Sequence, residues 1–337
     1  MTTYKGIQGF NIQNLSEDPV PTVAGWSSGN NLGTARYSLA GAGTQTATLA
    51  FGGSTGSPTG ATEEYDGSSW TSNPTGLNTA RRYLAGCGTQ TAGLAFGGNT
   101  TPPPANTGAT EEYDGSTWTS NPTGLNTVRG NLAGCGTQTA GLAFGGYTGT
   151  AGTAATEEYD GSTWTSNPTG LNTARYNLAG AGTQTAALAV GGFTTTPTGV
   201  TEEYNGSTWA SNPTGLNTAR RFLASCGIQT AALAFGGNSG SVTGATESYD
   251  GSTWTTLPAS LGTARYFLGG AGTQTAALGF GGFTGTANSA ATEEYNTWIP
   301  SSDYNFQNEG QVWYNNTENV WKVQDATAVG SWHLVEI

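Results

Sequence analysis

The sequence predicts an all-β fold, a six-bladed β-propeller with four antiparallel strands in each blade. Three observations predict it. A sequence segment of about 45 residues occurs six times, each copy contains four strand-like segments, and a Tyr-Asp-Gly or Tyr-Asn-Gly turn recurs in five copies. Repeats of roughly 40 to 50 residues are typical of solenoids and propellers. Four short strands per repeat favour the propeller, because radial closure leaves only short sheet edges exposed.

The repeats stay in phase along most of the chain. A Thr-Ala-Arg or Thr-Val-Arg step recurs every 45 to 48 residues, and its arginines are Arg36, Arg81, Arg129, Arg175, Arg220 and Arg265. The segment Thr-Glu-(Glu/Ser)-Tyr also occurs six times, and its tyrosines are Tyr65, Tyr113, Tyr159, Tyr204, Tyr249 and Tyr295. No stretch shows the apolar spacing of roughly 3.6 residues that indicates a helix.

In the fourth repeat the expected strands follow one another in order. Residues 175–185 (RYNLAGAGTQT) are mostly small, as suits a strand close to a crowded axis. Residues 186–192 (AALAVGG) form a buried apolar run that two glycines stop. Residues 200–206 (VTEEYNG) and 207–213 (STWASNP) flank an Asn-Gly turn, the strongest short-range signal of a β-hairpin.

The ends of the repeat region predict how the ring closes. A segment around Trp26 resembles the outer strand of a repeat, but the three strands that should precede it are missing. The last repeat supplies those three strands and ends at residues 291–296. We therefore expect the strand around Trp26 to complete the sixth blade. The alternative is Trp298, which follows Tyr295 by only three residues, too few for the same hairpin.

This reading divides the chain into an N-terminal attachment segment (1–21), the propeller (22–296) and a C-terminal β-hairpin module (297–337). Residues 311–323 (QVWYNNTENVWKV) alternate apolar and polar side chains on either side of an Asn-Thr-Glu-Asn turn, the pattern of a β-hairpin. The propeller would then be inserted between two halves of a small attachment element.

The sequence of the repeat resembles that of a known protein family. LAFGG at residues 142–146 is followed by EEYDGSTWTSNPTGLNTAR at 157–175, so an apolar strand and two glycines precede Tyr-Asp, Trp, Pro and Arg. This order resembles the kelch repeat over roughly residues 22–296. The resemblance implies a propeller that presents loops to a partner. Tyr159 and Trp164 stand five residues apart, slightly closer than in the usual kelch repeat, which shortens the hairpin turn and leaves the blade intact.

Three further resemblances concern the kind of protein to which the chain belongs. Residues 309–337 contain GQVWYNNTENVWKV and GSW, which resemble the short β-hairpin modules of bacteriophage tail fibres and other virion structural proteins. The N-terminal NIQNLSEDPVP resembles the lead-in to such modules. The near-identical repeats themselves resemble kelch-like proteins of marine phages. These resemblances imply a virion structural protein.

The charge and the apolar content of the chain limit the partners that it is expected to bind. The formal net charge is −12, and Lys5, Lys322 and eight arginines are the only fixed cations. An acidic surface repels phosphate backbones, so we expect no nucleic-acid partner. No apolar run is long enough to cross a bilayer, and no secretory signal is visible at the N-terminus. We therefore expect no membrane insertion, synthesis in the host cytoplasm, and a final place on a virion, at the tail or the particle surface.

No residue pattern predicts catalysis, a cofactor or a metal site. Cys87, Cys135 and Cys226 occupy one repeat position that is otherwise alanine, which indicates small buried packing sites. The chain has a single histidine, His333, too few for a histidine metal site. The Glu157-Glu158 pair and its copies recur in five repeats, and neighbouring strand residues point to opposite faces, so they do not converge on one bond. We expect a non-enzyme.

The six repeat arginines are candidate site residues. Each begins the strand expected nearest the axis, so together they could form a cationic ring at the channel mouth and hold a phosphate, a carboxylate sugar or an acidic partner. The alternative is structural: each arginine pairs with a glutamate of the Thr-Glu-Glu-Tyr strand or binds carbonyls of the connecting loop. Its presence in all six repeats favours the structural alternative.

The loops between Gly-Gly and the Thr-Glu strand vary freely while the strands barely change. Tyr147, Phe193 and Phe283 head three of these loops and could stack on sugar rings. Variable loops on a rigid scaffold are where recognition is usually placed. The alternative is that these loops are merely tolerated linkers.

The leading hypothesis is a phage tail-fibre or tail-tip propeller that binds a host-surface glycan or protein without catalysis. The second is a capsid or tail decoration whose terminal segments dock on other virion proteins, and the third is a cellular kelch scaffold. No coiled-coil heptad is present, so homo-oligomerisation stays open.

Overall fold

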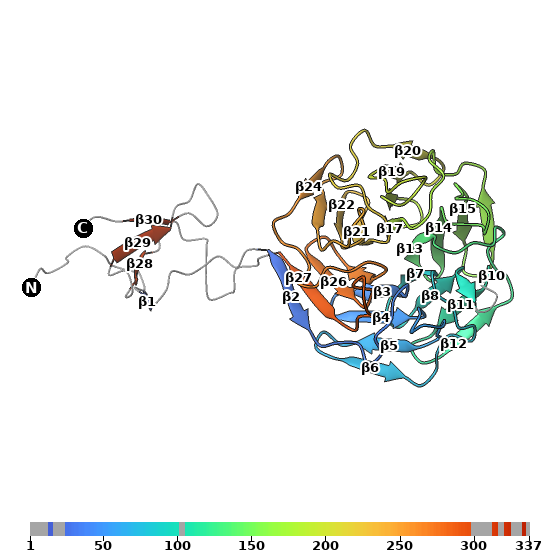
Figure 1. Ribbon diagram of the computed structural model, residues 1–337, viewed down its shortest axis with the longest axis horizontal. Helices are drawn as coiled ribbons and strands as arrows, with labels where there is room; N and C mark the ends of the chain where they lie inside the picture. The colour runs from blue at the N-terminus through green and yellow to red at the C-terminus, as the bar shows by residue number, and fades with distance from the viewer. Residues whose placement is uncertain are drawn as a thin grey trace, which may run out of the picture. The chain divides into compact units, whose positions relative to one another are not determined.

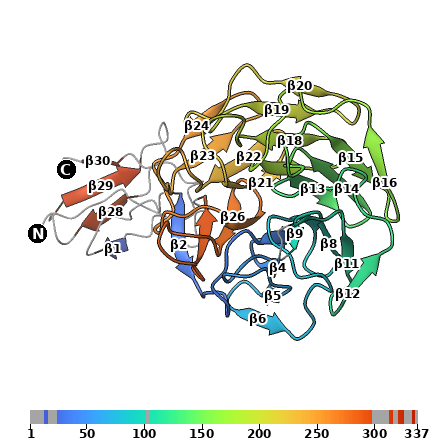
Figure 2. The same ribbon diagram turned by 45° about the vertical axis from the view of Figure 1, so that its right-hand side comes forward.

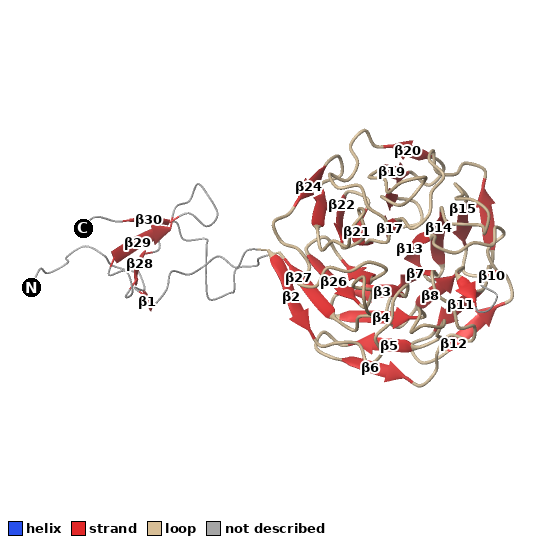
Figure 3. Cartoon of the chain, viewed as in Figure 1, coloured by secondary structure: helices blue, strands red, loops and turns tan. Residues whose placement is uncertain are grey.

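The computed structural model describes residues 24–100 and 105–297. It also describes the backbone of four terminal strands: β1 (Gln13–Leu15), β28 (Val312–Asn315), β29 (Val320–Gln324) and β30 (Trp332–Leu334). The chain divides into two compact units, residues 26–296 and the combined ends 1–25 and 297–337. The described residues are strands and loops without a helix (Figure 3), so none of them forms a helix that could span a bilayer.

The larger unit is a ring of six four-stranded antiparallel sheets (Figure 1), which confirms the predicted six-bladed β-propeller. The strands of the first three blades, from the axis outward, are β3 (Ala40–Thr44), β4 (Ala47–Phe51), β5 (Thr62–Tyr65) and β6 (Trp70–Asn73); β7 (Ala85–Gly88), β8 (Gly93–Phe96), β11 (Thr110–Tyr113) and β12 (Trp118–Asn121); and β13 (Ala133–Thr137), β14 (Ala140–Phe144), β15 (Thr156–Tyr159) and β16 (Trp164–Asn167).

The other three blades repeat this order. Their strands are β17 (Ala179–Gly182), β18 (Ala187–Val190), β19 (Thr201–Tyr204) and β20 (Trp209–Ser211); β21 (Ala224–Ile228), β22 (Ala231–Phe235), β23 (Thr246–Tyr249) and β24 (Trp254–Thr256); and β25 (Gly269–Gly272), β26 (Ala276–Phe280), β27 (Thr292–Asn296) and β2 (Gly25–Gly29). A small hairpin, β9 (Asn99–Thr100) with β10 (Ala105–Asn106), extends one loop of the second blade.

The sixth blade is closed by the N-terminal strand, as the sequence predicts. Its sheet order is β2-β27-β26-β25, and β2 lies beside the last strands of the ring in both views (Figures 1 and 2). Trp26 donates from Nε1 to Thr246 Oγ1 of the fifth blade at 2.9 Å, as each other outer-strand tryptophan does to its preceding blade. Trp298, the alternative, lies outside the described residues.

The core lies between neighbouring blades. Leu142 and Phe144 of the third blade are fully buried against Tyr204 and Trp209 of the fourth. The second strand of each blade therefore has apolar contacts on both faces, which explains why it reads as a continuous apolar run. Glycine in the inner strand makes this approach possible, because a Cβ on Gly134 would lie 2.3 Å from Cζ of Phe96.

Glutamine side chains tie the blades together near the axis. Gln184 donates from Nε2 to the carbonyls of Gly141, at 3.1 Å, and Tyr159, at 2.7 Å, both in the preceding blade. Gln45 makes the same two bonds to the sixth blade. The interface that joins the last blade to the first is thus built like the others.

The smaller unit contains one described sheet, in the order β1-β28-β29-β30. β28 and β29 pair antiparallel, with Val312 opposite Val323, which confirms the C-terminal hairpin. β1 from the N-terminal segment pairs parallel to β28, so one sheet contains strands from both ends of the chain. The expected Asn-Thr-Glu-Asn turn lies outside the described residues.

Replacing Trp26 with alanine should weaken ring closure. Its indole packs on Phe235 and Tyr295 at ring-centroid distances of 4.8 and 5.4 Å. Because Trp26 is only half-buried, we expect a loss of about 2–3 kcal/mol in the free energy of unfolding, below the roughly 3–5 typical of fully buried aromatic rings. Urea denaturation measures it, with Ser28→Ala on the solvent side of β2 as the control. A Trp26→Ala loss no larger than that of the control would contradict closure by this strand.

Candidate functional site

The six repeat arginines lie inside the blades. Each is fully buried and forms an ion pair with the first glutamate of the third strand in its own blade. None of them lines either opening of the central channel. The hypothesis of an exposed cationic ring at the channel mouth is therefore wrong for Arg36, Arg81, Arg129, Arg175, Arg220 and Arg265. The expectation that arginine begins the axial strand is also wrong, because each arginine precedes that strand by four residues, as Arg175 precedes Ala179.

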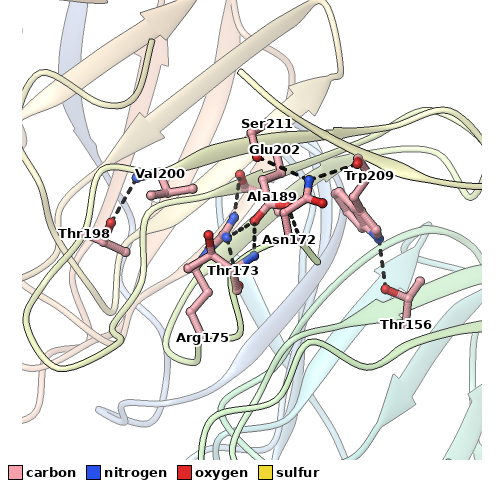
Figure 4. Close-up of polar contacts among 10 residues, drawn as sticks. All are labelled: Thr156, Asn172, Thr173, Arg175, Ala189, Thr198, Val200, Glu202, Trp209 and Ser211. Carbon is pink, nitrogen blue, oxygen red and sulfur yellow. Dashed lines mark hydrogen bonds and ion pairs between the residues drawn. The ribbon is translucent and has the colours of Figure 1, made fainter. Parts of the chain in front are cut away.

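Figure 4 shows the arrangement in the fourth blade. Arg175 pairs through Nη1 with Glu202 and donates from Nη2 to the carbonyl of Ala189 at 3.3 Å. The same carboxylate accepts the backbone N–H groups of Asn172 at 2.6 Å and Thr173 at 3.2 Å. Glu202 therefore holds the crossing that enters its blade, and the alternative that each arginine pairs with a Thr-Glu-Glu-Tyr glutamate matches the geometry.

Burial of Arg175 and Glu202 carries a desolvation cost, and it makes each buried charge depend on its partner. Desolvation lowers the pKa of the Arg175 guanidinium, and the charge and hydrogen bond of Glu202 oppose that shift. A buried pair of this kind adds little over a well-packed apolar pair, but removing one partner leaves a buried charge without compensation. The pair therefore fixes the position of the crossing more than it adds net stability.

The second glutamate of the strand joins neighbouring blades. Tyr159 donates its hydroxyl hydrogen bond to Glu112 of the preceding blade, and Asn121 Nδ2 binds the same carboxylate oxygen at 3.2 Å. Burial and this carboxylate raise the pKa of the Tyr159 phenol. The two glutamates of each pair thus serve different contacts on opposite faces of the strand. In the fifth blade Ser248 replaces the second glutamate.

A ring of backbone hydrogen bonds between neighbouring blades surrounds a recess at one mouth of the channel. Six residues, two after each repeat arginine, have φ angles of 55° to 58° and donate their N–H to the carbonyl of the equivalent residue in the preceding blade, at 2.8–3.0 Å. They are Ser38, Tyr83, Asn131, Asn177, Phe222 and Phe267. The bond from Ser38 to Phe267 joins the first blade to the sixth. These residues line a recess of ≈ 100 Å³.

The three predicted loop aromatics lie around this recess. Tyr147, Phe193 and Phe283 are half-buried, and each pairs by backbone with the residue that follows a repeat arginine. Phe193 stacks edge-on against Tyr176 at 5.4 Å, and Phe283 contacts Tyr266 at 5.7 Å. They share the loop side of the propeller with the blade crossings, as expected, and their role in binding stays a prediction.

The recess residues are the site that reasoning from sequence missed. The signal is present in the sequence: the two positions after each arginine are Tyr-Ser, Arg-Tyr, Gly-Asn, Tyr-Asn, Arg-Phe and Tyr-Phe, between segments that barely change.

The opposite side of the ring is acidic. Each third strand runs from the loop side to a turn at the far side, and four of these turns carry an aspartate. The Asp66 carboxylate accepts the backbone N–H groups of Ser69 and Ser68, which lowers its pKa to about 2. These aspartates shape the turns and give this side its charge.

The channel itself is lined by the small residues of the six inner strands. The three cysteines lie among them, buried, and Cys87 donates from Sγ to the carbonyl of Thr137 at 3.4 Å. Burial raises the pKa of the Cys87 thiol to about 12. Cysteine and alanine thus fill the same small packing site.

Comparison with known proteins assigns no family. No protein-family model matches the chain, and no curated protein sequence matches it. The class that the structure defines is a six-bladed β-propeller with four-stranded blades.

The Arg175–Glu202 pair can be tested by a double-mutant cycle. Arg175→Met should cost about 3–5 kcal/mol in the free energy of unfolding, because it leaves Glu202 charged and buried. Arg175→Met combined with Glu202→Gln should cost clearly less than Arg175→Met alone. Urea denaturation measures both, with Arg221→Tyr, outside any ion pair, as the control. A double variant that loses as much as Arg175→Met alone, or more, would contradict a coupled buried pair.

The third-strand tyrosines that contact the preceding blade lead us to expect a loss of stability at alkaline pH. Burial first, and then a glutamate partner, raises the phenol pKa above its usual value of 10.0 in five of them: Tyr65, Tyr113, Tyr159, Tyr204 and Tyr249. The unfolded chain ionises first, so this stabilisation is complete below pH 10 and is lost as the pH rises above it. The melting temperature should fall above pH 10, and fall less in Tyr159→Phe. A melting temperature that falls as much in Tyr159→Phe as in the unaltered protein would contradict the prediction.

Proposed function

We propose that this chain is a non-enzymatic structural protein of a bacteriophage particle, a kelch-like tail-fibre or tail-tip propeller whose loop side binds a host-surface glycan or protein. The observation that carries the proposal is the division of the ring into a near-constant frame and one variable side. The buried pairs such as Arg175–Glu202 repeat in all six blades. The loops and the recess residues vary from blade to blade.

This division supports recognition better than catalysis. Recognition needs a rigid frame with a surface that can change without disturbing the frame. Here the loops connect to the frame by backbone hydrogen bonds that do not depend on side-chain identity, such as Tyr176 to Phe193 and Tyr266 to Phe283. Substitutions in these loops therefore leave the blades intact.

The terminal unit supports attachment to a particle. Its sheet contains strands from both chain ends, so the propeller is inserted into it. The sequence of residues 309–337, which resembles virion hairpin modules, suits a contact with another virion protein. The proposal therefore assigns recognition to the propeller and docking to the ends.

The test uses virus particles that carry this chain. Gold-labelled antibody should mark the tail tip or fibres, and Tyr147→Ala with Phe193→Ala should reduce adsorption to host cells while particles remain intact. Deleting residues 297–337 should remove the chain from particles. Ile228→Thr, an exposed change to the residue that other repeats carry, is the control.

Other outcomes would replace the proposal. Label spread over the shell or tail tube, with normal adsorption of the loop variants, would make the chain a decoration protein. Absence of label from every particle would leave a cellular interaction scaffold.

A further inference from the structure

The recess at the loop-side mouth has two chemically different halves. Tyr83, Phe222 and Phe267 form an aromatic arc, with Phe222 and Phe267 at a centroid distance of 3.8 Å and Tyr83 5.3 Å from Phe267. Asn131 and Asn177 occupy the other half of the same recess. All six backbone positions are equivalent, so ring geometry does not dictate this separation.

An unpartnered polar group lines the amide half. Asn177 is 8% exposed, and its Oδ1 has no hydrogen-bond partner. A buried acceptor without a partner is rare in folded proteins and calls for one from outside. A hydroxyl group of a ligand in the recess would supply that hydrogen bond.

Two arginines outside the ion pairs flank the recess. The guanidinium of Arg221 lies 4.9 Å from the ring centroid of Phe222, and that of Arg82 lies 5.1 Å from the ring centroid of Tyr83. Their Nε atoms are buried, and Arg82 donates from Nη1 to the Tyr37 hydroxyl at 3.3 Å. No carboxylate among the described residues neutralises either guanidinium, so each can attract an anion.

The acidic side chains of the ring are distributed unequally between its two sides. The loops and crossings on the recess side contain no aspartate or glutamate, whereas the turns at the other side carry the aspartates. An anion that approaches this acidic protein is therefore directed to the side of Arg82 and Arg221.

We propose that this recess binds an acidic oligosaccharide. The aromatic arc stacks on the C–H face of one sugar ring, Asn131 and Asn177 bind its hydroxyls, and Arg82 or Arg221 binds a carboxylate of the same or a neighbouring sugar. This inference rests on the proposed function and names the ligand class of that recognition side.

An acidic peptide fits the recess less well. A bound peptide commonly uses free backbone groups of its host, as in strand addition. The N–H groups of the six lining residues are already donated around the ring. A ligand must therefore bind through side chains, which suits a sugar with its apolar face and hydroxyl rim.

The repeats themselves supply variants that keep the fold. Phe222→Asn and Phe267→Asn introduce the residue that Asn131 and Asn177 already place at φ 56° and 57°. Arg82→Tyr and Arg221→Tyr introduce the residue found at the same position in three other blades. Ile228→Thr, on the far side of the ring, is the matched control.

The experiment uses the full chain on an array of uronate- and sialate-bearing oligosaccharides, each beside its carboxyl-reduced form, with oligo-glutamate peptide as a further probe. We expect binding to at least one acidic oligosaccharide. Calorimetry should show a loss of at least about tenfold in Phe222→Asn with Phe267→Asn, as for removal of an aromatic anchor. Arg82→Tyr with Arg221→Tyr should abolish the preference for the acidic form, and Ile228→Thr should bind normally.

Several results would overturn the inference. These are no binding to any acidic oligosaccharide, equal binding by the recess variants, or capture of the peptide alone. Adsorption to host cells separates this failure from that of the proposed function. If the chain binds cells and the recess variants bind them equally, the proposed function stands and the recess inference fails. If the chain binds no cells, the proposed function fails whatever the array shows.

Discussion

Closure of the ring is the constraint on which the rest of the structure depends. Six blades must each fill one sixth of a turn, and the last must meet the first through the same contacts. Three contacts achieve this: the Trp26 strand becomes the outer strand of the sixth blade, the Ser38 N–H binds the carbonyl of Phe267, and Gln45 binds two carbonyls of the sixth blade. Blades of nearly equal shape are built here from nearly equal sequences, and the Glu-Glu-Tyr and Thr-Ala-Arg segments therefore recur with few changes.

The repeated polar residues set the positions of chain segments inside and between wedges. The first glutamate, with its arginine, holds the crossing that enters a blade, and the second accepts a bond from the tyrosine of the next blade. Because these contacts are buried, a loss in one blade is felt at its neighbours. The loop side is free of this demand, since its backbone bonds persist whatever the side chains are. Variation is therefore concentrated on the loop side, where a ligand can reach it.

Much of the fold could be predicted from the sequence, because period, hairpin turns and the place of Trp26 are local or periodic signals. The candidate site could be predicted only in part. The sequence favours pairing of each arginine with a glutamate of the Thr-Glu-Glu-Tyr strand, but only the packed structure shows which of the two glutamates it is and that the pair of Arg175 and Glu202 is fully buried. The recess ring was missed for a similar reason. Aromatic residues such as Phe267 rarely adopt a positive φ, and hydrogen bonds between neighbouring blades, which no local sequence pattern reveals, hold them there.

Native-state amide hydrogen exchange tests ring closure most directly. The N–H groups of the six recess residues differ in sequence position but have the same role, so the structure predicts similar protection for all of them. Ser38, whose bond joins the first blade to the sixth, should exchange as slowly as Asn131 in the middle of the ring. Rapid exchange at Ser38 beside slow exchange at Asn131 would mean that the ring opens at this seam, and would contradict the closed propeller.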